Sequence, residues 1–151
     1  MLSQTAEYAL RATLYLAARQ GDGRLQVGEV AEALGIPRNY LSKTLHQLAR
    51  AGVLDSSRGK SGGFRLARPP GEISLAEVVA PFNGPTGAQI CLLGRHACSD
   101  ADPCAAHDRW KSVSNRVSTF FGETMLSDLQ GRGGERGTGG RTDGPWARRQ
   151  A

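Results

Sequence analysis

Three thiols and two imidazoles are gathered within 17 residues of this 151-residue chain. The thiols belong to Cys91, Cys98 and Cys104, and the imidazoles belong to His96 and His107. Thiolates are soft ligands that suit zinc or iron–sulfur clusters, and an imidazole can complete such a ligand set. An odd number of cysteines in a reducing compartment is more typical of metal or redox chemistry than of disulfides. The segment therefore predicts a metal or cluster site, with His107 and His96 as alternatives for the fourth ligand.

The residues that follow the second thiol decide whether these side chains can meet. Asp102-Pro103 is typical of the cap and first position of a helix, and it places Cys104 and His107 on one face of the first turn. The N-terminus of a helix also favours a thiolate or an anionic cluster. We therefore expect both side chains to point at one site, with the preceding cysteine loop folding over it.

A long apolar stripe follows the expected ligands. Its members recur at steps of three and four residues and predict one helix over 105–130. They are Trp110, Val113, Val117, Phe120, Phe121 and Leu129. Because a domain of this size offers little other surface to cover the stripe, we expect it to pair with the same helix of a second copy in a homodimer. Burial against the chain's own core is the alternative.

Three further helices are predicted in the N-terminal part of the chain. Apolar residues at helical spacing mark 3–19 and 27–34, and a third helix starts at Pro37 and ends before Gly52. Gly35 permits a tight turn between the second and third helices, which is the outline of a helix-turn-helix. The polar side chains on or near the outward side of the third helix are Arg38, Asn39, Tyr40, Ser42, Lys43 and His46. Side chains of these types bond to base edges and phosphates, so we expect them to contact DNA; a plain helical hairpin is the alternative.

Two short strands, 53–57 and 64–67, are predicted next, joined by a basic, glycine-rich tip. The side chains expected to reach phosphates or a minor groove are Arg58, Lys60, Ser61 and Arg65. Seven Lys and Arg residues between Arg38 and Arg68 face the single acid Asp55, within a chain of net charge +5. A nucleotide-binding glycine loop is excluded because no helix opens after the tip. A recognition helix with a basic hairpin predicts a winged helix that binds double-stranded DNA.

The expected fold class is mainly α with a small β-hairpin wing, and it divides into four parts. Residues 1–80 form the winged helix-turn-helix DNA-binding domain, which ends in a short helix capped by Ser74 and Glu77, and 81–104 form a cluster-binding loop, loop-like from Pro81. Residues 105–130 form the dimerisation helix, and 131–151 form a disordered basic tail rich in Gly and Arg. The chain shows no export signal, no apolar run of about 20 residues and no catalytic group set, so we expect a cytoplasmic non-enzyme without a membrane partner.

Over about residues 1–129 the chain resembles the iron–sulfur winged-helix transcriptional regulators that include IscR, NsrR and RirA. The matching motifs are Glu7-Tyr8-Ala9-Leu10-Arg11, Ile36-Pro37, Tyr40-Leu41, Arg58-Gly59, Gly62-Gly63, Ser74-Leu75-Ala76-Glu77-Val78 and the three-cysteine loop before a long helix. The resemblance implies a homodimer in which each long helix crosses its partner, with wings and recognition helices on a palindromic operator. It implies a regulator, expected to be a repressor, that senses iron–sulfur status, redox state or nitric oxide.

Cys104-Ala-Ala-His107-Asp-Arg-Trp110 is most similar to the IscR-type members, and it implies a 2Fe-2S cluster held by Cys91, Cys98, Cys104 and His107. The first two thiols have six residues between them here and five in IscR. The NsrR-like members imply a 4Fe-4S cluster completed by an acidic residue of the partner protomer at the position of Glu7. A zinc-stabilised or thiol-based redox-sensing DNA-binding protein and a small iron–sulfur electron-transfer protein are the remaining alternatives.

Overall fold

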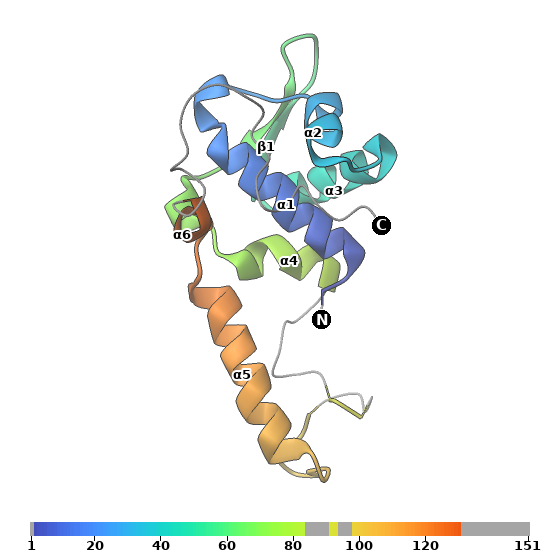
Figure 1. Cartoon of the computed structure of the whole chain (residues 1–151), viewed down its shortest axis with the longest axis vertical. Helices are drawn as coiled ribbons and strands as arrows, with labels where there is room; N and C mark the ends of the chain where they lie inside the picture. The colour runs from blue at the N-terminus through green and yellow to red at the C-terminus, as the bar shows by residue number, and fades with distance from the viewer. Residues whose placement is uncertain (1, 84–90, 94–97, 131–151) are drawn as a thin grey trace.

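A head of short helices and one hairpin carries a single protruding helix (Figure 1). The computed structural model describes residues 2–83, 91–93 and 98–130. In chain order the helices and strands are α1 (Gln4–Ala18), α2 (Val27–Leu34), α3 (Arg38–Arg50), β1 (Leu54–Ser57), β2 (Gly63–Leu66), α4 (Leu75–Asn83), α5 (His107–Glu123) and α6 (Leu126–Gln130). Single 3-10 turns lie at Gln20–Asp22 and Pro70–Glu72. The fold is therefore mainly α with a two-stranded antiparallel hairpin, as the sequence predicts.

The helix-turn-helix forms where the sequence predicts it. The carboxylate of Glu29 accepts from the backbone N–H of Gln26 at 2.7 Å and caps the start of α2. Gly35 ends this helix with φ 63°, a left-handed conformation that glycine adopts without strain. The guanidinium of Arg11 on α1 donates to the carbonyl of Leu34 at 2.7 Å, so a cation meets the last turn of α2.

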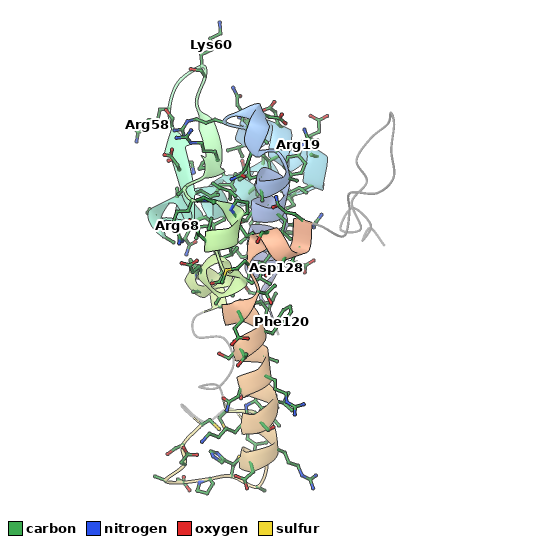
Figure 2. All side chains as sticks on the ribbon, turned by 90° about the vertical axis from the view of Figure 1, so that its left-hand side faces the viewer. Arg19, Arg58, Lys60, Arg68, Phe120 and Asp128 are labelled. Atoms are coloured by element: carbon green, nitrogen blue, oxygen red, sulfur yellow. The ribbon has the colours of Figure 1, made fainter. Side chains whose placement is uncertain are left out.

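The hairpin is joined to the head at its root. Leu25 forms a β-bridge with Phe64, through N–H to O contacts of 3.0 and 2.9 Å in the two directions. A side-chain carbon at Gly63 would lie 2.4 Å from the carbonyl oxygen of Leu25, so only glycine fits there. The basic tip, in contrast, projects beyond the head and carries Arg58 and Lys60 (Figure 2).

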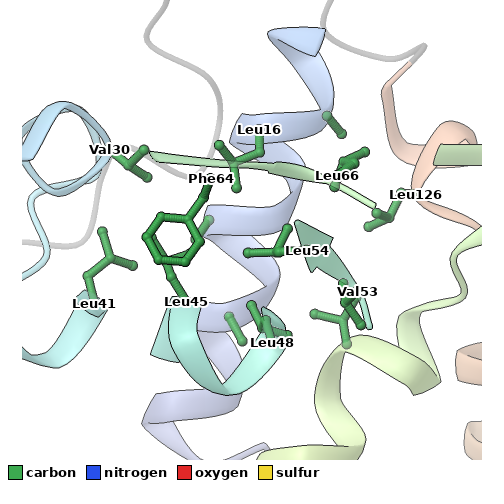
Figure 3. Packing of buried hydrophobic residues seen from close by; sticks show 14 of the residues in the cluster. Leu16, Val30, Leu41, Leu45, Leu48, Val53, Leu54, Phe64, Leu66 and Leu126 are labelled. Atoms are coloured by element: carbon green, nitrogen blue, oxygen red, sulfur yellow. The ribbon is translucent and has the colours of Figure 1, made fainter. Parts of the chain in front are cut away.

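One apolar core holds the helices and the hairpin together (Figure 3). Leu41, Leu45 and Leu48 of α3 are completely buried, and Phe64 of the hairpin packs among them. Leu126 of α6 is also completely buried in this core. The C-terminal helix therefore belongs to the head, although α5 separates it from the rest in sequence.

The predicted start of the cysteine-segment loop at Pro81 is wrong. The loop expected from Pro81 starts later, because α4 continues through Pro81 to Asn83. The side-chain amide of Gln47 donates to the carbonyl of Pro81 at 2.9 Å, and Asn83 Oδ1 accepts from the N–H of Ser3 at 2.9 Å. These contacts from α3 and the N-terminus satisfy polar groups of the last turn and stabilise it.

The single helix expected over 105–130 is also wrong, because the structure has two helices there. The first begins at His107 rather than at Asp102-Pro103, and it ends at Glu123, where the C-cap residue Thr124 is extended. Leu75 N–H donates to the carbonyl of Thr124 at 2.9 Å, and Leu126 N–H donates to the carbonyl of Ile73 at 3.0 Å. These bonds to the start of α4, together with burial of Leu126, replace the helical hydrogen bonds that a continuous helix would make.

Three further expectations concern a membrane span, the C-terminal tail and His96. Among residues 2–83, 91–93 and 98–130, no helix is long and apolar enough to cross a membrane. The predicted disorder of 131–151 falls outside the described residues, as does His96.

Candidate DNA-binding surface and cysteine site

The outward face of α3 carries most of the side chains predicted to contact DNA. Arg38, Asn39, Tyr40, Lys43 and His46 are exposed, and Ser42 is half-buried. The last part of this helix and β1 border an open depression of about 640 Å³, lined in part by Lys43, His46, Arg50 and Ser56. Cationic and hydrogen-bonding groups around a depression are the features that suit a phosphate backbone.

His46 is held in place by its own helix and by the hairpin. Its Nδ1 lies 2.8 Å from the carbonyl oxygen of Ser42, and its ring meets Phe64 edge-on with centroids 5.1 Å apart. Because a carbonyl oxygen only accepts, Nδ1 must carry the proton in this contact. Nε2 is then the ring atom that can bond to an external group.

The wing contains an ion-pair network that includes Arg65, one of the residues predicted to contact DNA. Asp55 and Arg65 lie opposite each other in the hairpin, with 3.1 Å from Nε and 3.0 Å from Nη2 to the same carboxylate oxygen. Arg24 reaches that oxygen at 2.8 Å. Hydrogen bonds from Arg24 and then from Arg65 hold the pKa of Asp55 below its ordinary value. Arg65 is thus an internal partner as well as a basic residue, whereas Arg58, Lys60 and Ser61 are exposed at the tip.

The cysteine segment brings one thiol and one imidazole into contact. Cys98 Sγ lies 3.3 Å from Nδ1 of His107, whose side chain is almost completely buried. Nε2 of the same ring lies 2.8 Å from Oδ1 of Asp100. Lys111 Nζ contacts both oxygens of that carboxylate, at 2.6 and 2.8 Å. Bonds from Lys111 and then from His107 hold the pKa of Asp100 below its usual range, and Asp100 raises the pKa of Lys111.

The other two thiols lie in the electrostatic neighbourhood of Cys98. Desolvation raises the pKa of the Cys98 thiol, and the thiolate charges of Cys91 and then Cys104 raise it further. Cys91 is buried and Cys104 is half-buried, and none of the three forms a disulfide. Cys104 lies before α5 rather than in its first turn, and its carbonyl accepts from His107 N–H at 2.9 Å.

The donor types of this segment, thiols and an imidazole, suit zinc or an iron–sulfur cluster. Among the residues that the structure describes, no three Cys, His, Asp or Glu side chains converge on a point where one ion could bind. The full ligand set of three thiols and His107 stays a prediction.

Glu7 is separate from this site within one chain. It is exposed in the first turn of α1, in the head, while the 98–106 segment lies at the far end of α5 (Figure 1). Any contact between Glu7 and the thiols would therefore have to come from a second copy of the chain.

The apolar stripe of α5 is divided between two surfaces. Phe121 is buried and Val117 packs partly against the core, so the chain covers this part itself. Val113 and Phe120 remain 54% exposed each. Val113 also borders a second open depression of about 390 Å³, together with Leu92 and Trp110. The stripe is therefore only partly covered by the chain to which it belongs.

Two side chains of the site, Asp100 and Lys111, were not predicted as functional. Asp100 lies in an irregular loop, where no periodicity indicates which side chains converge. Lys111 lies four residues after His107, so the helical spacing could have placed it on the same face. Arg24, the third member of the wing network, precedes the helix-turn-helix and gives no comparable signal.

A helical head with a helix-turn-helix and a basic hairpin defines a winged-helix DNA-binding protein of the transcriptional-regulator class. Residues 2–132 match the Rrf2 family, which is described as iron-dependent transcriptional regulators. The chain belongs to the Rrf2 family, and its relatives are regulators rather than enzymes.

Individual relatives agree with this assignment. A protein of Aquifex aeolicus that is named an HTH-type transcriptional regulator is 37% identical over 131 residues, which cover 85% of this chain and 90% of that protein. The HTH-type transcriptional regulator IscR of Xenorhabdus nematophila is 31% identical over 128 residues, covering 85% and 77%. IscR proteins are thus among its relatives, as the sequence resemblance implies.

Solved structures support the fold. CymR (YrzC), described as the global cysteine regulator of B. subtilis, superposes with a TM-score of 0.76 at 23% identity, covering 87% of this chain and 97% of CymR. IscR of T. potens superposes with a TM-score of 0.73 at 23% identity, covering 92% and 93%. At these identities the likeness concerns the fold alone.

Proposed function

We propose that this chain is a homodimeric transcriptional repressor whose binding to a palindromic operator is controlled by an iron–sulfur cluster held by Cys91, Cys98, Cys104 and His107. The observation that carries the proposal is the contact of 3.3 Å between Cys98 Sγ and His107 Nδ1, with both other thiols in electrostatic range. A thiol and an imidazole in contact provide two different ligand types within one site. The 2Fe-2S form is proposed because the resemblance of Cys104-Ala-Ala-His107-Asp-Arg-Trp110 to the IscR-type members implies it; a 4Fe-4S form would draw on Glu7 of a second copy.

DNA contact is assigned to α3 and the hairpin tip. The side chains proposed to touch bases or phosphates are Arg38, Asn39, Tyr40, Ser42, Lys43, His46, Arg58, Lys60, Ser61 and Arg65. Those on α3 would enter a major groove, and those at the tip would follow the adjacent phosphates or minor groove. Arg65 would have two roles, because it also forms an ion pair with Asp55 inside the wing.

Dimerisation is assigned to the uncovered part of α5. Val113 and Phe120 are exposed on a helix that protrudes from the head, and Leu92 and Leu93 nearby in the cysteine segment are exposed as well. Burying such side chains against a second copy is favourable by about 25 cal/mol per Å² of apolar surface. A two-fold pair of heads also suits two operator half-sites.

The link between cluster and DNA runs along α5. A bound cluster supplies redox and ligand-exchange chemistry, including reaction with oxidants or nitric oxide. The residues of this chain would pass a change at 98–107 to the head, because α5 begins at His107 and the segment after its C-terminal end is bonded to Ile73 and Leu75 at the start of α4. Two cluster states with different positions of α5 would then have different DNA affinities.

The experiment is anaerobic purification with iron and sulfide analysis, followed by operator binding with and without the cluster. We expect brown protein with iron and acid-labile sulfide, and a change in operator affinity when the cluster is removed. Cys98→Ser is expected to abolish the cluster, while Ser99→Ala, its exposed neighbour, serves as the matched control. Colourless protein with zinc, or equal affinity in both forms, would contradict the proposal.

A thiol-based sensor is the second candidate, favoured by the same contact between Cys98 and His107. It predicts protein without iron in which oxidant alone changes DNA affinity, and in which Cys98→Ser abolishes that response. Iron analysis and oxidant treatment of cluster-free protein therefore separate the two candidates.

A further inference from the structure

The carboxylate of Asp100 contacts the imidazole of His107 on the side opposite Cys98. Nε2 lies 2.8 Å from Asp100 Oδ1, while Nδ1 lies 3.3 Å from Cys98 Sγ. An ionised carboxylate has only acceptor atoms, and a neutral imidazole has a single N–H. The proton of a neutral His107 must therefore be on Nε2, and the lone pair of Nδ1 faces the thiol.

Asp100 would not hold this position by itself. Its side chain is 74% exposed, so water competes for both of its oxygens. Lys111 binds both oxygens, at 2.6 and 2.8 Å, and it follows His107 by one helical turn on α5. The carboxylate of Asp100 is thus bound by two side chains of α5, those of His107 and Lys111, although Asp100 belongs to the irregular loop before that helix.

We propose that Asp100, held by Lys111, is a positioning residue that keeps the proton of His107 on Nε2 and so makes Nδ1 the iron-binding atom. The proposal rests on the proposed function, because it takes His107 to be a cluster ligand. Imidazoles that bind metals are commonly oriented by a carboxylate on their second nitrogen, which fixes the tautomer and the direction of the lone pair. Here the fixed direction is the one in which the nearest thiol lies.

The tautomer can be measured before any cluster is bound. Long-range ¹H–¹⁵N correlation spectra of the cluster-free chain should show His107 protonated at Nε2. Asp100→Asn places an amide that can donate at the same position, so we expect a shift toward the form protonated at Nδ1. A wild-type ring protonated at Nδ1, or spectra unchanged by Asp100→Asn and Asp100→Ala, would overturn the proposal.

The ligand atom is identified in the cluster-bound, full-length protein. Pulsed EPR of the reduced cluster measures the coupling of each ring nitrogen to the electron spin. With histidine labelled by ¹⁵N at only one ring position at a time, the strong coupling should come from Nδ1. Asp100→Ala should release iron about 10- to 100-fold faster and shift the reduction potential. Lys111→Met should also speed the release of iron. Lys111→Arg keeps a cation that can bind Asp100, so iron release should return most of the way to the wild-type rate.

Asp108→Asn is the matched control. The substitution removes one negative charge beside His107. Asp108 affects Lys111 through its charge alone, and the carboxylate that contacts the imidazole is that of Asp100. We expect iron release within about twofold of wild type, against the 10- to 100-fold expected for Asp100→Ala. Thermal unfolding of each variant checks that the head is intact.

The two hypotheses fail differently. Wild-type protein without iron and sulfide ends the proposed function, and this proposal ends with it. A normal cluster bound through Nε2, or iron release from Asp100→Ala at the wild-type rate, ends only the positioning role and leaves the cluster site in place.

Discussion

Ser74 and Met125 form an isolated β-bridge between the start of α4 and the segment that joins α5 to α6. The bridge fixes the end of the protruding helix to the head by backbone bonds on both sides, from Leu75 N–H to Thr124 and from Leu126 N–H to Ile73. It is followed at once by the completely buried Leu126. In this chain α5 is therefore anchored to the head at one end and bears the cysteine site at the other.

Leu126→Ala should weaken this anchor. Removing a completely buried leucine side chain leaves a cavity, and we expect a loss of about 2–5 kcal/mol in the free energy of unfolding. Leu129→Ala, on the same short helix but 38% exposed, is the control, with an expected loss below about 1 kcal/mol. Urea denaturation of both variants measures the difference. Equal losses would mean that α6 is not anchored through its buried side chain.

Asp55→Asn should make the wing less stable in a pH-dependent way. The pKa of Asp55 is lowered by Arg24 and Arg65, so the folded state favours the carboxylate. This stabilisation is complete above the ordinary aspartate value of about 3.9 and disappears as the pH falls through the lower folded value. We expect the variant to unfold more easily at pH 7 and to match wild type in strong acid.

Thermal unfolding from pH 2 to pH 7 compares this variant with Glu32→Gln, which removes one exposed carboxylate from α2. A constant difference between wild type and Asp55→Asn over the whole range would show that the ion pairs with Arg24 and Arg65 do not stabilise the wing.

Arg58→Ala and Lys60→Ala should each weaken DNA binding and reduce its salt dependence. Each lost phosphate contact lowers the slope of log affinity against log salt by about 0.9. Arg68→Ala is the matched control, because the guanidinium of Arg68 is bonded to Glu72 and Glu77 within the chain. Titrations at several salt concentrations measure the slopes. A slope unchanged by both tip variants would remove the wing from the binding surface.

Val113→Asp should dissociate the proposed dimer, because a charge buried in an apolar contact is strongly unfavourable. Asn115→Asp adds the same charge at an exposed position of the same helix and should leave the association unchanged. Sedimentation velocity reports both masses. A Val113→Asp protein with the wild-type mass would place the contact between copies elsewhere.

The sequence predicted the head well because its signals are local. The spacing of Leu41, Leu45 and Leu48, the turn at Gly35 and the Ser74–Glu77 capping box each act within a few residues, and all are found. The division between α5 and α6 was missed because it depends on Met125 meeting Ser74, 51 residues earlier. Helical periodicity runs through that break unchanged.

The site was predicted by residue type but not by arrangement. Thiols and an imidazole within a short segment indicate their chemistry without a structure, and the contact of Cys98 with His107 agrees with it. Asp102-Pro103 was a poor guide to the start of α5, because the residues up to Ala106 form an irregular loop and turn instead. That loop is what allows Asp100 to reach the far side of the imidazole.

The bridge between Leu25 and Phe64 has a mechanical consequence. The root of the hairpin is hydrogen-bonded to the segment just before α2, and no side chain larger than that of glycine fits at residue 63. The wing therefore cannot pivot against the start of the helix-turn-helix at this joint without breaking main-chain bonds. We expect a displacement that reaches the head through α5 to move the root of the wing together with the start of the helix-turn-helix, whereas the tip beyond the strands lies outside this bridge.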